Sequence, residues 1–192
     1  MNRFVCCLLA CLLFSAIGCV NTSSSTGKNS SKPITEQISD SLEKRDILKA
    51  SDYSRILSLS EAAERGDSLS SEDIQWLLTL DERYPETDKL VQYGPSSVPP
   101  VPPQSVRLTQ IGQVFLSAKP SQYPPNTVDD VYRFALRLIE YGDSAPNATH
   151  RGLIILRELG KKEAVSEIRP LLASSNPDIR EFAEKALTRL EQ

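Results

Sequence analysis

Apolar residues after Pro33 recur at intervals of three or four positions, which is the spacing of one face of an α-helix. Four such faces follow one another along the chain: Ile34, Ile38 and Leu42; Tyr53, Ile56, Leu57 and Ser60; Ile74, Leu77 and Leu78; and Leu108, Ile111, Phe115 and Ala118. Alternation of apolar and polar residues, the mark of a half-buried strand, does not extend over a useful length. The pattern therefore predicts an all-α fold.

Polar and proline-rich segments divide these helical stretches. Ser70-Ser71-Glu72-Asp73 resembles a capping box at the start of a helix. Residues 94–104 read GPSSVPPVPPQ, which predicts an extended connector or a polyproline II segment instead of helix. A docking motif for a proline-binding domain is the alternative interpretation of this segment. We therefore expect an N-terminal helical region at 34–93, a linker at 94–104 and a C-terminal helical region at 105–192.

The last sixty residues contain an internal repeat. Asn176 is a favourable N-cap residue, and Pro177 occupies the first position of the helix that it starts. One wide apolar face follows, made of Ile179, Phe182, Ala183, Ala186, Leu187 and Leu190. A shift of 31 residues aligns Pro146, Ala148, Gly152, Ile155, Leu156 and Leu159 with Pro177, Ile179, Ala183, Ala186, Leu187 and Leu190. A fixed offset of this kind predicts stacked helical hairpins.

These two units resemble HEAT repeats, in particular the short HEAT-like type of bilin-lyase-related proteins. Residues 168–172 (IRPLL) are similar to the end of the family's first helix, and 176–180 (NPDIR) to its turn and second helix. The last unit keeps the family's Arg as Arg180 but has Ser174 where Asp is usual, and the earlier unit keeps Asp143 but has Thr149 in place of Arg. The resemblance implies a short α-solenoid whose core the helices of 34–119 complete. A plain helical bundle with a chance similarity is the alternative.

A difference between the two units suggests a partner surface. Glu181, Glu184, Lys185 and Thr188 lie on the polar side of the last helix, and the repeat aligns them with His150, Leu153, Ile154 and Arg157. Two polar positions are thus aliphatic in the earlier unit. Either residues 34–119 pack over Leu153 and Ile154, or these side chains form an exposed apolar patch on a surface where solenoids bind partners.

The first nineteen residues have the features of a secretion signal. Arg3 precedes an almost unbroken apolar run at 4–17, which is too short to span a bilayer but has the length of a signal-peptide core. Residues 1–18 are therefore expected to be removed. Residues 19–33 are rich in serine and poor in apolar side chains, which predicts a disordered tether.

The sequence Ala16-Ile17-Gly18-Cys19 resembles the lipobox of bacterial lipoproteins, although Leu is usual at the position of Ala16. The resemblance implies cleavage after Gly18 and attachment of lipid to Cys19, so that the chain is anchored in the cell envelope. Val20 stands where Asp favours retention at the inner membrane, which implies the outer membrane, facing the periplasm, in a source with two membranes. An ordinary secretory signal is the alternative.

Composition and charge exclude several classes of function. The chain has a net charge of −3 and no long basic run, which argues against binding of nucleic acid. All four cysteines lie within residues 1–19 and His150 is the only histidine, so we expect no disulfide, metal or cofactor in the domain, and no catalytic constellation. The sequence predicts a non-catalytic scaffold or assembly factor that binds a protein. A structural or cell-wall-binding lipoprotein is the alternative, followed by an accessory subunit of an envelope enzyme.

Overall fold

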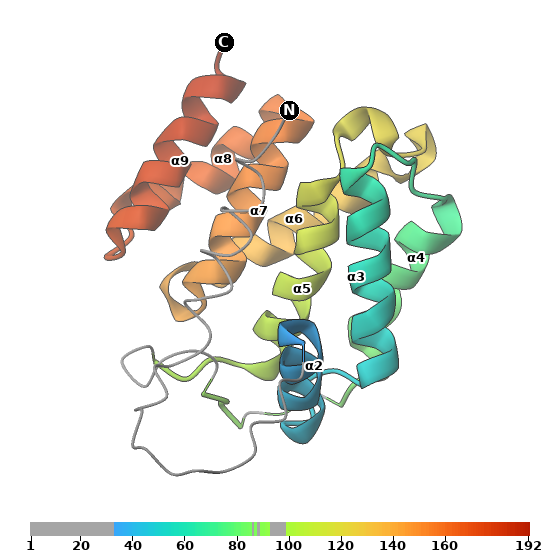
Figure 1. Ribbon diagram of the computed structural model, residues 1–192. Coiled ribbons are helices and arrows are strands. Elements are labelled where there is room, and N and C mark those ends of the chain that lie inside the picture. The colour runs from blue at the N-terminus through green and yellow to red at the C-terminus, as the bar shows by residue number, and fades with distance from the viewer. Residues whose placement is uncertain (1–32, 86, 88, 93–98) are drawn as a thin grey trace.

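The structure, a computed structural model, describes residues 33–85, 87, 89–92 and 99–192 (Figure 1). Within these ranges the fold is all-α, which confirms the predicted class. Extended pairing in the described ranges is limited to one antiparallel bridge between Val91 and Val101. The α-helices of the described residues are α2 (Ile34–Lys44), α3 (Ala50–Glu64), α4 (Ser71–Leu80), α5 (Pro103–Ser117), α6 (Val128–Ile139), α7 (Pro146–Leu159), α8 (Val165–Ile168) and α9 (Pro177–Leu190).

Short 3-10 helices join several of these elements. They are η1 (Asp81–Arg83), η2 (Pro120–Gln122), η3 (Pro125–Thr127), η4 (Gly142–Ser144), η5 (Lys162–Ala164) and η6 (Arg169–Ala173). Among the helices of the described residues, none is both long and apolar enough to cross a bilayer.

Every second helix belongs to one continuous row. Helix α3 packs on α5, α5 on α7, and α7 on α9. Helix α6 covers α7, and α8 with η6 covers α9, so that a second layer follows the first. Figure 1 shows α9 at one end of the molecule and α3 with α4 at the other. Each inner helix of the row is therefore enclosed on two sides, whereas α9 has a neighbouring row helix on one side.

The helix starts predicted at Ser70 and Asn176 are confirmed, and a glycine that was not predicted ends α7. The Ser70 hydroxyl accepts a hydrogen bond from the backbone N–H of Asp73, at 3.0 Å, and caps α4. The side chain of Asn176 accepts hydrogen bonds from the N–H groups of Asp178 and Ile179, and Pro177 is the first residue of α9. Gly160 ends α7 in the left-handed conformation, at φ 67°, which glycine adopts without strain.

The predicted regions 34–93 and 105–192 share one hydrophobic core, which extends from Leu42 in α2 to Leu190 in α9. Helix α5 begins at Pro103, inside the predicted linker 94–104, so the prediction of a non-helical segment was wrong for its last two residues. The reason is that a proline at the first helical position loses no hydrogen bond, since its missing N–H would have had no partner within the helix.

Helices α6 and α7 are in tight contact at Gly152. A Cβ atom placed on this residue would lie 2.7 Å from the carbonyl oxygen of Ala135 and from Cγ2 of Ile139, and 2.8 Å from Cβ of Leu138. The repeat alignment pairs Gly152 with Ala183, so a small residue stands at this position in both units.

Candidate functional site

The surface of α7 that the repeat alignment singled out is only partly accessible. Leu153 is completely buried, so it cannot belong to an exposed patch, and that part of the prediction was wrong. His150, Ile154 and Arg157 are half-buried. The physical reason is the position of α7 in the row: it lies between α5 and α9, whereas the aligned residue Glu184 is exposed on α9, which contacts one row helix, α7, among the described elements.

His150 lies against the neighbouring row helix. Its ring centroid is 3.6 Å from that of Phe182 on α9, with the two planes tilted by 48°. Its Nε2 atom is buried and has no hydrogen-bond partner in the described part of the chain. Burial lowers the pKa of His150 below its ordinary value, and the nearby Arg151 lowers it further. The neutral form of His150 is therefore favoured at pH 7, and Asp178 is the nearby carboxylate that opposes this effect.

The charged residues around this surface have partners of their own. Arg157 donates two hydrogen bonds to Oε1 of Glu158, at 2.9 and 2.7 Å. On α9, the Lys185 ammonium pairs with Glu181 and also lies 5.1 Å from the centroid of the Phe182 ring. Of the predicted surface, His150, Ile154 and Arg157 are therefore partly accessible, and Phe182 on α9, which the prediction did not include, lies against His150.

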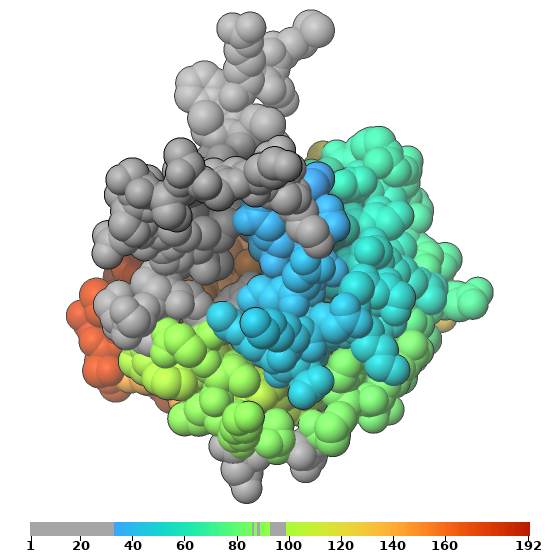
Figure 2. Space-filling model, turned by 60° about the horizontal axis from the view of Figure 1, so that its bottom comes forward, coloured from blue at the N-terminus to red at the C-terminus, as the bar shows by residue number. Residues whose placement is uncertain are grey.

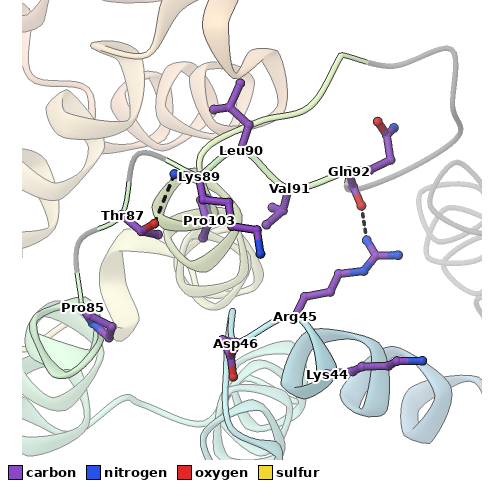
Figure 3. Close-up of a pocket in the computed structure, with 10 residues that line it drawn as sticks. All are labelled: Lys44, Arg45, Asp46, Pro85, Thr87, Lys89, Leu90, Val91, Gln92 and Pro103. Carbon is purple, nitrogen blue, oxygen red and sulfur yellow. Dashed lines mark hydrogen bonds between the residues drawn. The ribbon is translucent and has the colours of Figure 1, made fainter.

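A cavity of about 550 Å³ lies between the end of α2 and the segment before α5 (Figure 3). Its lining includes three cations, Lys44, Arg45 and Lys89, and the carboxylate of Asp46. The Arg45 guanidinium donates to the backbone carbonyl of Gln92, and Figure 3 shows Lys89 reaching into the cavity from the opposite wall. Figure 2 views this face, with α2 in blue beside the light-green residues around position 100. The cations attract negative charge, but the described residues of the lining include no histidine or cysteine that could act as a nucleophile or base.

A buried ion pair lies between η1 and α5. The Arg107 guanidinium donates through Nε to Oδ1 of Asp81 at 2.7 Å, and the side chains are 2% and 5% exposed. Gln104 donates to the other carboxylate oxygen at 2.6 Å, and Arg137 of α6 lies 3.5 Å from it. A carboxylate that is enclosed by donors in this way joins η1, α5 and α6, and its oxygens are occupied. The arrangement is that of a structural tie between helices.

Tyr84 lies beside this pair. Its hydroxyl donates to Oδ2 of Asp52 at 2.5 Å and accepts the backbone N–H of Lys49 at 2.9 Å, while the Arg107 guanidinium lies 5.1 Å from the ring centroid. Burial, together with the Asp52 carboxylate, raises the pKa of Tyr84 to about 12. The phenol is therefore fully protonated at neutral pH and is unsuited to act as a base.

Sequence reasoning missed both the cavity and the buried pair. Lys44 and Lys89 are far apart along the chain, as are Asp81 and Arg107, and no motif links either pair. Arg107, which stands between Val106 and Leu108, was the one available signal, because a charged residue within a helical apolar face has to find a partner.

The remaining predicted site residues lie outside the described part of the chain. These are Cys19 and the residues of the predicted cleavage site, Ala16, Ile17 and Gly18. Within the described part, no group of three or more His, Cys, Asp or Glu side chains could hold a metal ion. Comparison of the chain with known protein families, with curated proteins and with solved structures finds no match.

Proposed function

We propose that this chain is a lipoprotein of the bacterial cell envelope whose helical domain is a non-catalytic scaffold or assembly factor for a protein partner. The observation that carries the proposal is the row α3, α5, α7 and α9, with α6 and α8 layered on its later members. Stacked helices of this kind are typical of α-solenoids, which act by presenting an extended surface. The HEAT-like sequence of the last two units agrees with this arrangement.

Lipid on Cys19 would place the domain close to a membrane surface. Residues 20–32 stand between Cys19 and the described domain, and thirteen residues of any chain span at most about 45 Å. A domain on such a tether reaches partners within or just above the membrane. We therefore propose that Cys19 and the residues after it anchor the domain to the membrane.

The partner surface that we propose is centred on Ile154 and Phe182, which are half-buried on adjacent row helices. The same two helices carry the ion pairs Arg157–Glu158 and Lys185–Glu181, and Lys185 lies 5.1 Å from the Phe182 ring centroid. Apolar side chains with charged pairs nearby resemble the apolar centre and polar rim of a protein interface. The buried Leu153 supports this surface from beneath and does not contribute contact area.

A photo-crosslinking amino acid at position 154 tests the scaffold proposal in intact cells. We expect a discrete adduct with one protein, no such adduct from position 133 on the exposed side of α6, and loss of the adduct in Phe182→Ala. If position 154 yields no protein adduct and the chain instead sediments with purified cell wall, the structural or cell-wall-binding alternative is correct. An envelope enzyme as the captured protein, with activity that depends on the chain, would support the accessory-subunit alternative.

The anchor is tested separately. Mass spectrometry of the natural product should show an N-terminal Cys19 that carries lipid, and Cys19→Ala should release the chain from the membrane fraction. An unmodified N-terminus, or membrane association that is unchanged in Cys19→Ala, would contradict the anchor and leave the scaffold proposal to the crosslinking result.

A further inference from the structure

The contact between α7 and α9 contains an unusual polar atom. Nε2 of His150 is the one buried side-chain nitrogen or oxygen in the described ranges that lacks a hydrogen-bond partner. Buried polar atoms are nearly always paired, so an exception of this kind calls for an explanation. A neutral imidazole carries a proton on one nitrogen and a lone pair on the other, and the lone pair can occupy the buried position. The observed geometry is thus compatible with the neutral ring.

The surroundings of His150 oppose a positive charge. Arg151 and Arg157, on α7 itself, and Lys185, on α9, all disfavour the protonated ring, and Asp178 at the start of α9 is the carboxylate that favours it. Phe182 offers the ring an aromatic face, but Lys185 already lies over the same ring, 5.1 Å from its centroid. A protonated His150 at this face would be repelled by the Lys185 ammonium. From α5, the side chain that bonds Arg151 is the neutral Gln113.

We propose that protonation of His150 loosens the packing of α9 on α7, so that the terminal helix of the domain opens more often at acidic pH. The protonated ring carries an N–H donor at the buried Nε2 position, where the described residues provide no acceptor, and it adds a positive charge near Arg151, Arg157 and Lys185. Separation of α9 from α7 gives the ring access to water, which can accept the hydrogen bond from the N–H group and screen the repulsion between the positive charges. The inference concerns the packing of the domain and holds whether or not Cys19 is lipidated.

The direction of the pH effect follows from proton linkage. Burial lowers the pKa of His150 in the closed arrangement below its ordinary value of 6.5, with Arg151 adding to the effect, while an open α9 returns the ring to water and to that value. The open state therefore binds the proton more readily than the closed state. Its population is constant above about pH 7.5 and rises as the pH falls through 6.5.

Hydrogen exchange on the full chain, followed by mass spectrometry, tests the proposal. After correction for the intrinsic pH dependence of exchange, we expect opening of peptides from α9 to increase by about threefold or more between pH 7.5 and 5.5. Peptides from α3 serve as the internal control and should not respond. His150→Gln keeps a polar side chain that does not titrate, and it should remove the pH dependence of α9.

Because His150 is the only histidine, its ring gives a single imidazole signal in proton NMR, provided that the purification tag contains no histidine. We expect that signal to titrate with a pKa below 6.5. A value at or above 6.5 would overturn the proposal even if the variant failed to fold. Equal pH dependence in the wild type and in His150→Gln, or equal opening of α3 and α9, would overturn it as well.

Discussion

Asp143, in the turn before α7, accepts hydrogen bonds from both the backbone N–H and the hydroxyl of Ser175, in the turn before α9, at 2.9 and 2.6 Å. The Ser174 hydroxyl also donates to Asp143, and Arg180 donates to the carbonyl oxygens of Ser174 and Ser175, at 2.7 and 3.1 Å. The carboxylate of Asp143, in the turn of the earlier unit, thus accepts hydrogen bonds from the turn of the later unit. That later turn has Ser174 at the position that corresponds to Asp143. One carboxylate holds the two units together.

Replacement of Asp143 by Asn should lower the melting temperature at pH 6 by about 2–5 °C, because an amide cannot accept all the hydrogen bonds of the carboxylate. Those bonds, from Ser174 first and then Ser175, lower the pKa of Asp143 to about 2. The stabilisation is therefore present above pH 3.8, the ordinary value, and is lost as the pH falls towards 2. Differential scanning calorimetry across this range should show the wild type and Asp143→Asn converging.

Glu82→Gln, a change at an exposed carboxylate on η1, is the matched control and should leave the melting temperature almost unchanged. A constant difference between wild type and Asp143→Asn from pH 6 to pH 2 would show that the carboxylate charge is not what holds the turn of Ser174 and Ser175.

Gly152→Ala should reduce the free energy of unfolding by about 1–3 kcal/mol, since the added methyl group meets backbone and Cβ atoms of α6 that cannot move independently. Gly112→Ala is the comparison. There the nearest atom is Cδ1 of Leu138, at 3.3 Å, which belongs to the flexible end of a side chain. We expect that variant to be neutral or to gain up to roughly 1 kcal/mol from helix propensity. Urea denaturation measures both, and equal effects would contradict the close approach of α6 and α7.

The sequence predicted what depends on local chemistry. Ser70 and Asn176 cap helices because a short side chain with an oxygen suits that position in any fold, and Gly152 is small because its unit repeats a tight position. The all-α class follows in the same way from the helical spacing of apolar residues. The caps and the helical class are determined within a few residues of the chain, whereas the position of Gly152 was visible only through the 31-residue repeat.

Features that depend on neighbours along the stack could not be predicted in this way. The repeat alignment equates Leu153 with the exposed Glu184, but α7 has a row helix on both sides and α9 has one on a single side. The same register position is therefore buried in one unit and exposed in the other. The long-range pairing of Asp81 with Arg107 likewise arises only when η1 packs on α5.

Leu153 and Ile154 should respond very differently to truncation. Leu153→Ala removes a completely buried side chain and should cost about 2–5 kcal/mol of unfolding free energy. Ile154→Ala, at a half-buried position, should cost less than half as much. Guanidinium denaturation of the two variants gives the comparison. Equal losses would place Ile154 in the core and remove it from the proposed partner surface.

The buried pair of Asp81 and Arg107 should behave as a coupled unit. Arg107→Met leaves a carboxylate that is 5% exposed without its strongest partner and should cost about 3–5 kcal/mol of unfolding free energy. Asp81→Leu alone should cost a similar amount, because it isolates the guanidinium.

The double variant replaces both charges by apolar groups and should therefore be less destabilised than the sum of the single variants predicts. A double-mutant cycle by urea denaturation measures this difference, and the exposed pair Arg169–Glu191 provides the control, with an expected coupling below about 1 kcal/mol. If the two cycles gave the same coupling, Asp81 would be in contact with water in solution, and the tie between η1 and α5 would have to come from Gln104 and the apolar core alone.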